Sequence, residues 1–195
     1  GLNRRFYSNV QKIKPLVEKS NEIFAQLYIP ERAKDLLSRD ELTRNHWHMA
    51  NGIHGVDLLT YLVGPAKEFY SRTAWGKLEY TKLSRFHTAR YQTTRGHQVS
   101  FMMNFDSPGG WRIHLFLPEL EIRISPFEQT IVKTLKGEEV ISIDEEDRIA
   151  KPGFLNQAKC FLSGIDRPSS SIKNWVSYEE ALTSMKVVDA IFAGQ

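Results

Sequence analysis

The sequence predicts an α+β domain in which an open, mainly antiparallel β-sheet carries helices packed on one face. Residues 1–64 mix helix and strand patterns, residues 66–149 have the pattern of successive strands, and helical spacing returns after residue 150. Within the strand region, apolar and polar residues alternate, which is typical of a sheet with one buried and one open face. Helices on either side of such a region bury their apolar sides on the sheet, which gives two layers.

The chain begins with a helix and a strand. The apolar residues of "SNVQKIKPLVEKS" recur at helical spacing and share one face: Val10, Ile13, Leu16 and Val17. Ser8 is placed to act as the N-cap of this helix, and Pro15 predicts a kink or an early end. The segment "IFAQLYIP" then predicts a strand that Pro30 terminates.

A second helix is predicted after the polar stretch from Glu31 to Arg44. Its apolar residues again have helical spacing: Ile53, Val56, Leu59 and Val63. Gly64-Pro65 ends it. The stretch that leads into this helix, "NHWHMANGIH", holds three histidines, the side chain that most easily carries a proton or a metal near neutral pH. It is therefore the first place to look for chemistry.

The strand region consists of short segments separated by turn residues. The segments are "EFYSRTAWGKLEY", "SRFHTARYQTT", "HQVSFMMNFD", "WRIHLFLPELEIRIS", "QTIVKTLKG" and "EEVISIDEED". Turn signals such as Ser107-Pro108-Gly109-Gly110 lie between them. In the fourth segment Ile113 and Leu115 alternate with polar residues, which predicts one face open to water or to a partner. We interpret His87, His97 and His114 as surface residues of this sheet.

The closing segments "PGFLNQAKCFLSGI" and "SYEEALTSMKVVDAIFAGQ" have apolar residues at helical spacing. Ser177 and Glu180 form a capping box at the start of the second, and the short polar linker "DRPSSSIKNWV" joins the two. The single cysteine, Cys160, excludes a disulfide within the chain, and its apolar helical face predicts an inert core thiol.

Composition limits the classes of partner. The net charge of the 195 residues is +3, and basic and acidic residues are mixed along the chain. Proteins that bind nucleic acid gather basic residues on one face, so no nucleic-acid partner is predicted. No apolar run is long enough to cross a membrane and no signal-peptide pattern opens the chain, so we expect a cytoplasmic protein.

Several stretches, in order, resemble the Gfo/Idh/MocA family, the group of glucose–fructose oxidoreductase and inositol dehydrogenase. "GLNRRFYSNVQKIKPLV" is similar to the crossover that follows the nucleotide-binding domain of that family, and "GIHGVDLLTYLVG" is similar to its G-x-H-x-x-D helix. The end of the chain is also similar, with Phe154, Gln157, Phe161 and Gly164 before "SYEEALTSMKVVDAIFAG". The resemblance spans nearly the whole chain.

The resemblance implies that residues 1–195 form a single C-terminal domain for substrate binding and oligomerisation. They contain no strand–GxGxxG–helix unit, so the N-terminal Rossmann cofactor domain of the family is absent from this chain. The implied activity is NAD(P)-dependent oxidation of a sugar, a sugar derivative or a cyclitol. NAD or NADP would bind the full-length protein, and none is expected in this fragment, which should be inactive alone.

The resemblance places the catalytic histidine of the family at His54. Removal of hydride from an alcohol carbon requires that the hydroxyl proton also leave, and a neutral imidazole can accept it. Asp57 lies one helical turn further on and would support the site, although a solvated surface aspartate is an equal alternative.

One position departs from the family. Many members have aspartate four residues before the histidine, where this chain has Ala50 followed by Asn51. An amide can hydrogen-bond but cannot carry the negative charge that raises the basicity of imidazole. His46 and His48, in the expected loop before the helix, are candidates to compensate, or are polar residues at the rim of a cleft. Their spacing does not place both on one helix face, so no metal site is predicted.

Further candidates come from charge and aromaticity. Arg4 and Arg5 lie where the chain would leave the cofactor domain, so they could contact a cofactor phosphate or an anionic sugar group, or form an interdomain ion pair. The aromatic residues that could stack on a sugar ring or belong to the core are Trp47, Tyr61, Trp111 and Trp175. The bulky residues expected near the sheet faces are Phe101, Met103, Trp111 and Phe116. In the family the corresponding sheet forms a homodimer contact.

Three interpretations therefore stand. The first is the C-terminal domain of a sugar or cyclitol dehydrogenase. The second is a family member that has lost catalysis and serves as a ligand-binding or assembly module, for which Ala50 is the main argument. The third is an unrelated α+β domain that binds a small ligand.

Overall fold

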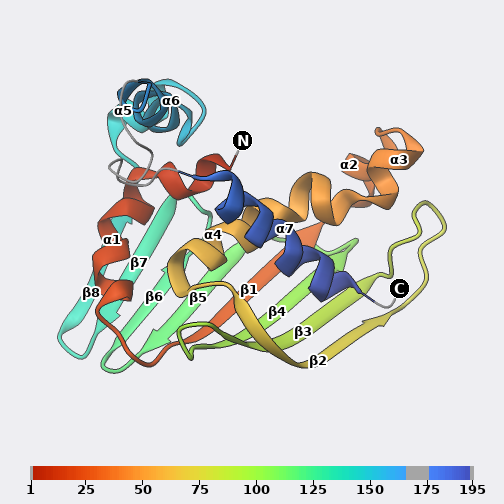
Figure 1. Ribbon diagram of the computed structural model, residues 1–195, viewed down its shortest axis with the longest axis horizontal. Helices are drawn as coiled ribbons and strands as arrows, with labels where there is room; N and C mark the ends of the chain where they lie inside the picture. Colours follow the sequence, from red (N-terminus) through yellow and green to blue (C-terminus); the bar gives the residue numbers. More distant parts are fainter. Residues whose placement is uncertain (1, 166–175, 194–195) are drawn as a thin grey trace.

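The computed structural model describes residues 2–165 and 176–193, and a single sheet organises them (Figure 1). Its strands are β1 Phe24–Glu31, β2 Ala66–Trp75, β3 Phe86–Thr93, β4 Gln98–Phe105, β5 Arg112–Leu117, β6 Leu120–Ile124, β7 Gln129–Thr134 and β8 Gly137–Ser142. Their order across the sheet is β2-β3-β4-β1-β5-β6-β7-β8. Only the pair β1–β4 is parallel among these strands, so the predicted open, mainly antiparallel sheet is confirmed.

Helices occupy one side of this sheet (Figure 1). They are η1 Asn3–Phe6, α1 Ser8–Glu18, α2 Ala33–Leu37, α3 Glu41–Asn45, the π-helical turn η2 His48–Gly52, α4 Ile53–Val63, α5 Glu145–Ile149, α6 Phe154–Ser163 and α7 Tyr178–Phe192. Helix α4 packs on β1 and is flanked by η1, α1 and α7, so it is buried nearly all round from Gly55 to Thr60. Helix α7 packs beside it on β2 and β3. The two-layer α+β architecture predicted from the sequence is therefore present.

The core forms where alternate strand residues meet the helices. On β1 the inward residues are Ala25, Leu27 and Ile29, and on β4 they are Val99, Phe101, Met103 and Phe105. Val10, Ile13 and Val17 of α1 are fully buried, as the helical spacing predicts, whereas Leu16 is exposed. Burial of such large apolar side chains is the main favourable term in the folding of the domain.

Three local predictions for the first segment were wrong. Tyr7, and not Ser8, is the N-cap of α1; Ser8 is the first helical residue, and its backbone N–H and hydroxyl both donate to Asp147 Oδ2. Helix α1 continues through Pro15, which is exposed, because apolar side chains on both sides of it stay buried. Strand β1 extends one residue beyond Pro30.

Other predictions failed because burial depends on neighbours distant in sequence. His87 and His97 are buried rather than on the sheet surface, and the ring of His87 contacts that of Phe192. Cys160 is only half-buried on α6, a helix with no fully buried residue, so it is not a core thiol. The short helices α2 and α3 were not predicted, since five residues are too few to show a periodicity.

The predictions for the closing segment can be checked only where the structure describes its residues. The capping box of Ser177 and Glu180 at the start of α7 is confirmed. Most of the linker "DRPSSSIKNWV", and Trp175 with it, lies outside the described residues. None of the helices in the described part of the chain is long and apolar enough to cross a membrane.

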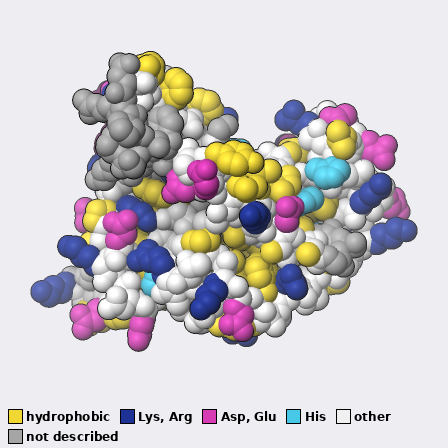
Figure 2. Space-filling view, viewed as in Figure 1, with side chains coloured by type: hydrophobic (Ala, Val, Ile, Leu, Met, Phe, Trp, Pro, Cys, Tyr) yellow, Lys and Arg dark blue, Asp and Glu magenta, His cyan; other side chains and the backbone are white. Residues whose placement is uncertain are grey.

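The second face of the sheet has no helix over it in the described ranges 2–165 and 176–193 (Figure 1). Phe24, Met102 and Phe116 are each 37–38% exposed there, and the rings of Phe24 and Phe116 lie 6.0 Å apart. Phe101 and Met103 point to the covered face instead. On the opposite, helical side, acidic and basic side chains are interspersed (Figure 2).

Gly153 lies where the start of α6 packs closely against the first residues of the chain. Gly153 precedes α6 with φ of 78°, and its N–H donates to Asp147 Oδ1 at 2.6 Å. A Cβ at this position would overlap the carbonyl oxygen of Asn3 and lie 2.8 Å from Cδ1 of Tyr7. Gly96 has a similar φ of 83° but no atom within 4 Å of such a Cβ.

We expect Gly153→Ala to lower the free energy of unfolding by about 3 kcal/mol or more, because it adds overpacking to the strain of a left-handed backbone. Gly96→Ala is the matched control and should cost about 1 kcal/mol, the strain alone. Urea denaturation of both variants measures the difference. Equal losses would show that the approach of η1 to α6 is not tight.

Candidate functional site

Four separate parts of the chain meet at one polar cavity of about 290 Å³. They are the end of β1 with the start of α2, the single turn η1, the π-helical turn η2 and the β4–β5 loop. Its principal lining residues are Arg4, Glu31, Arg32, Asp35, Asn51 and Trp111. Charged and aromatic groups together at a cavity of this kind are typical of a small-molecule site.

Glu31 is the most unusual group in this cavity. Its backbone is fixed by the pairing of β1 with β4, and its side chain is only 4% exposed. Oε1 accepts a hydrogen bond from Nδ2 of Asn51 at 3.0 Å. Burial raises the pKa of the Glu31 carboxyl to about 7, an effect that the side chains of Trp47 and Asn51 offset in part. Glu31 therefore exchanges its proton near neutral pH.

Arg4 supplies a fixed cation at the same cavity. Its guanidinium lies 4.2 Å from the ring centroid of Trp111 and 5.2 Å from that of Phe127. Nη1 of Arg4 is buried and has no hydrogen-bond partner among the described residues. A buried unpaired donor is costly, so an anionic or hydroxyl group of a ligand would stabilise it. Arg4 thus fits the role toward a cofactor phosphate or an anionic sugar group that the sequence suggested.

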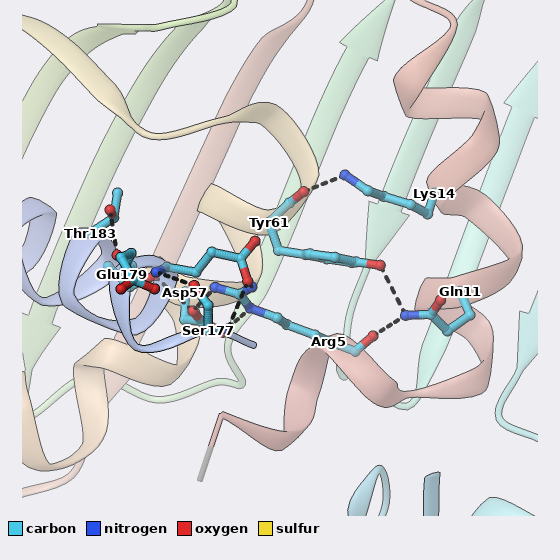
Figure 3. A network of polar contacts seen from close by, with 10 residues as sticks. Arg5, Gln11, Lys14, Asp57, Tyr61, Ser177, Glu179 and Thr183 are labelled. Atoms are coloured by element: carbon cyan, nitrogen blue, oxygen red, sulfur yellow. Dashed lines mark hydrogen bonds and ion pairs between the residues drawn. The ribbon is translucent and has the colours of Figure 1, made fainter. Parts of the chain in front are cut away.

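Arg5 does not fit that role, because its guanidinium binds Asp57 inside the protein (Figure 3). Nε and Nη2 of Arg5 donate to the two carboxylate oxygens at 2.8 and 2.5 Å, and the side chains are 3% and 1% exposed. The hydroxyl of Ser184 on α7 donates to the same carboxylate at 2.7 Å. Asp57 is therefore neither a solvated surface residue nor part of the cavity wall; it holds η1 and α7 against α4.

The ion pair is the centre of a wider polar network (Figure 3). Gln11 of α1 donates to the backbone oxygen of Arg5 and to the hydroxyl of Tyr61, and Lys14 donates to the backbone oxygen of Tyr61. Glu180 Oε2 lies 3.7 Å from Arg5 Nη1. Helices α1, α4 and α7 are thereby connected through η1, which fixes the position of the neighbouring Arg4.

His54 lies one helical turn after Asn51, at the start of α4, and is half-buried. Its Nδ1 is buried without a hydrogen-bond partner in the described part of the chain. Burial, with a contribution from Arg4, lowers the pKa of His54 to about 4, so the ring is neutral at pH 7. Arg4 interacts electrostatically with both His54 and Glu31, although His54 is not one of the residues that line the cavity.

His46 lies in the turn that ends α3, as expected, whereas His48 is the first residue of η2 rather than part of a loop; neither lines this cavity. His46 is exposed, with Nδ1 2.9 Å from the backbone oxygen of Leu42. The ring of His48 stacks on Phe192 of α7 at 4.6 Å, and burial lowers its pKa to about 4. Within residues 2–165 and 176–193, no three His, Cys, Asp or Glu side chains gather as metal ligands would.

The remaining aromatic candidates divide between core and cavity. Trp47 is buried in the core, Tyr61 belongs to the polar network around Arg5, and Trp111 lines the cavity beneath Arg4. Sequence reasoning missed Glu31, which it treated as the start of a polar stretch. The available signal was a carboxylate directly after a strand with an apolar inward face, at "LYIPE".

A larger cavity, about 850 Å³, lies between α3 and the β2–β3 loop. It includes Arg44, Asn45 and Lys82, and the side chain of Asn45 accepts the backbone N–H of Lys82 at 2.8 Å. It shares no lining residue with the cavity at Glu31. Its walls combine α3 with loop residues, among them the buried Leu78 and Leu83, and no strongly shifted carboxyl or imidazole lines it.

The fold and this site define a class: an open-sheet domain that presents a polar, acid–base cavity at the edge of its helical layer. No protein-family model matches the sequence, and no curated protein matches it. Solved structures do match, among them a dehydrogenase (MviM) from Clostridium difficile, with a TM-score of 0.76 and 16% identity over 98% of this chain and 60% of that one.

Two other solved structures agree with this likeness. An oxidoreductase from Agrobacterium radiobacter in complex with NAD⁺, L-tartaric acid and magnesium has a TM-score of 0.68 and 15% identity over 96% of this chain and 59% of its own. UDP-N-acetylglucosamine 3-dehydrogenase GnnA from Acidithiobacillus ferrooxidans has a TM-score of 0.64 and 16% identity over 98% of this chain and 57% of its own. The chain therefore has the fold of part of the Gfo/Idh/MocA-type oxidoreductases, as its motifs predicted, and spans about three fifths of their length.

The buried ion pair generates a stability prediction. Asp57→Asn leaves the guanidinium of Arg5 buried without its counter-charge, which should cost about 3–5 kcal/mol in the free energy of unfolding. Glu146→Gln removes one partner of an exposed pair with Lys159 and should cost less than about 1 kcal/mol. Thermal and urea denaturation measure both, and similar losses would contradict the special role of the Arg5–Asp57 pair.

Proposed function

We propose that this chain is the C-terminal substrate-binding and oligomerisation domain of an NAD(P)-dependent oxidoreductase acting on a sugar, a sugar derivative or a cyclitol. The observation that carries the proposal is the polar cavity at Arg4, Glu31 and Asn51, set in a fold shared with dehydrogenases. One similar structure contains NAD⁺, and another is named as a dehydrogenase of a nucleotide sugar.

Alcohol oxidation divides into a hydride transfer and a proton transfer. A nicotinamide cofactor, held by a module outside this chain, supplies the hydride acceptor when bound. The residues of this chain bind the alcohol and handle its proton. Arg4 binds an anionic or hydroxyl group, Asn51 orients a hydroxyl, and His54, neutral at pH 7, accepts a hydrogen bond or the proton from the hydroxyl being oxidised.

The alternative function is a non-catalytic module that binds a ligand or assembles a complex. The observation in its favour is Ala50, which is exposed and offers no carboxylate where the resemblance would place one. The two functions differ in whether the full-length protein oxidises a substrate, and in whether its activity depends on His54.

We predict that His54→Ala in the complete gene product lowers kcat/KM about 10²–10⁴-fold, the usual contribution of a proton-transfer group. Affinity for NAD(H) or NADP(H), measured by fluorescence titration, should stay unchanged, since the cofactor binds elsewhere. The 195-residue chain alone should bind neither cofactor. A protein that binds cofactor yet keeps full turnover after this substitution would exclude His54 as the proton acceptor.

We also propose that the chain forms a homodimer through the open face of the sheet, in the cytoplasm. That face carries an aromatic cluster of Phe24, Phe116 and His114, and the guanidinium of Arg112 lies 4.3 Å from the ring of Tyr28. Exposed aromatic groups on a flat sheet face are typical of protein–protein contacts.

The dimer makes a direct prediction. The wild-type chain should sediment as a dimer at micromolar concentration, and Phe116→Asp, which places a charge in the aromatic cluster, should sediment as a monomer with unchanged secondary structure. Leu135→Asp is the control, because Leu135 is 90% exposed in the β7–β8 turn, and it should leave the dimer intact. A monomeric wild-type chain would contradict the proposed interface.

A further inference from the structure

We propose that Glu31 is a second catalytic acid–base group of this site, the one that holds the proton removed from the substrate hydroxyl, with Asn51 as its orienting partner. This inference rests on the proposed oxidoreductase function and adds a residue that the sequence motifs do not mark.

Glu31 is placed to contact a ligand in the cavity. Glu31 lines the cavity, so its carboxyl can contact a bound ligand, yet the side chain is 4% exposed. Three features fix the backbone at Glu31. β1 pairs with β4, the backbone N–H of Ser107 donates to the Glu31 carbonyl oxygen at 3.4 Å, and α2 begins two residues later. A carboxylate buried at a cavity wall without an ion-pair partner in the described chain is costly to the fold, which is typical of functional groups.

Two side chains orient the carboxyl of Glu31. Asn51 donates to Oε1 at 3.0 Å, and the side chain of Trp47 also interacts with the carboxyl, which still lines the cavity. Asn51 and His54 lie one turn apart on the continuous helical segment formed by η2 and α4. Glu31 is thereby connected, through one hydrogen bond, to the segment that carries the imidazole.

Burial shifts the pKa of Glu31 more than the neighbouring charges do. The charged groups that face Glu31 are Arg4 from η1, Asp35 from α2 and the adjacent Arg32, and burial dominates over all of them. Its carboxyl, with a pKa of about 7, is half ionised at neutral pH, whereas His54, with a pKa of about 4, is a weak base. A base works best when its pKa is close to the working pH, so Glu31 is the better final acceptor.

The O–H bond of the alcohol breaks and its proton bonds to a carboxylate oxygen of Glu31, which changes from carboxylate to carboxylic acid. The oxygen forms a C=O bond as the C–H bond breaks, and the hydride leaves with its electron pair to an oxidised nicotinamide, the oxidant of the proposed function. Solvent then removes the proton from Glu31.

A titration of the chain itself tests the assignment without turnover. With ¹³C-labelled glutamate, the Glu31 carboxyl, identified by its absence in Glu31→Gln, should titrate near pH 7, and the His54 ring should stay neutral down to about pH 5. Gln keeps the oxygen that Asn51 contacts, so the variant should fold. A Glu31 carboxyl that titrates near pH 4.5 in the unmodified chain would overturn the inference, whatever the variant does.

Kinetics of the complete gene product provides the second test, with NAD⁺ or NADP⁺ and a panel of inositol, glucose, UDP-N-acetylglucosamine and glucuronate. In the wild type, kcat/KM should rise with pH through about 7; Glu31→Gln should abolish this rise and lower kcat/KM about 10²–10⁴-fold. Glu139→Gln, on the exposed edge strand β8, is the control and should match the wild type.

The outcomes separate the two proposals. If turnover depends on His54 while Glu31→Gln keeps the wild-type pH profile, the inference is wrong and the oxidoreductase function stands. If the wild type binds neither cofactor and oxidises none of the four compounds, both fall. Loss of the pH dependence in Glu31→Gln, with unchanged cofactor affinity, supports both.

Discussion

The buried ion pair between Arg5 and Asp57 is the interaction on which the site depends. It connects the first turn of the chain to α4, and Ser184 extends the connection to α7. Removal of two charges from water is costly, and the two short hydrogen bonds, the hydroxyl of Ser184 and the nearby Glu180 compensate for it. The consequence is geometric: Arg4 is the neighbour of Arg5, and Asn51 and His54 precede Asp57 on the same helical segment. One interaction therefore sets the relative position of residues that are about fifty apart in sequence.

The same burial acts in opposite directions on the two candidate acid–base groups. Loss of water disfavours whichever form is charged, so it raises the pKa of the Glu31 carboxyl to about 7 and lowers that of the His54 imidazole to about 4. The usual order of the pKa values of glutamate and histidine, with histidine the higher, is thereby reversed. At neutral pH the imidazole of His54 is therefore neutral, and the Glu31 carboxyl is close to half ionised.

The sequence was sufficient for whatever depends on local periodicity. Alternation along Arg112–Leu117 predicted one open sheet face, helical spacing predicted α4 and α7, and Ser177 with Glu180 predicted the cap of α7. It was insufficient wherever a residue far along the chain decides burial. Such residues are Phe192 over His87, Asp57 opposite Arg5, and Asn51 against Glu31, none of which leaves a periodic signal. The family resemblance indicated His54 and not Glu31, because a sequence motif does not show which distant residues are in contact.

The central position of β1 has a consequence for how the chain folds. The strand is first in the sequence, yet its two neighbours are β4 and β5, whose residues follow it by more than seventy positions. Hairpins such as β3–β4 and β5–β6 can close locally, but β1 has no strand partner until β4 has been made, and its second partner, β5, follows later. Such distant pairing is entropically expensive and slows folding. During synthesis on the ribosome, the apolar side of β1 thus lacks both of its neighbouring strands at first and one of them until residue 117 has left the exit tunnel, an interval in which exposed apolar surface is prone to aggregate.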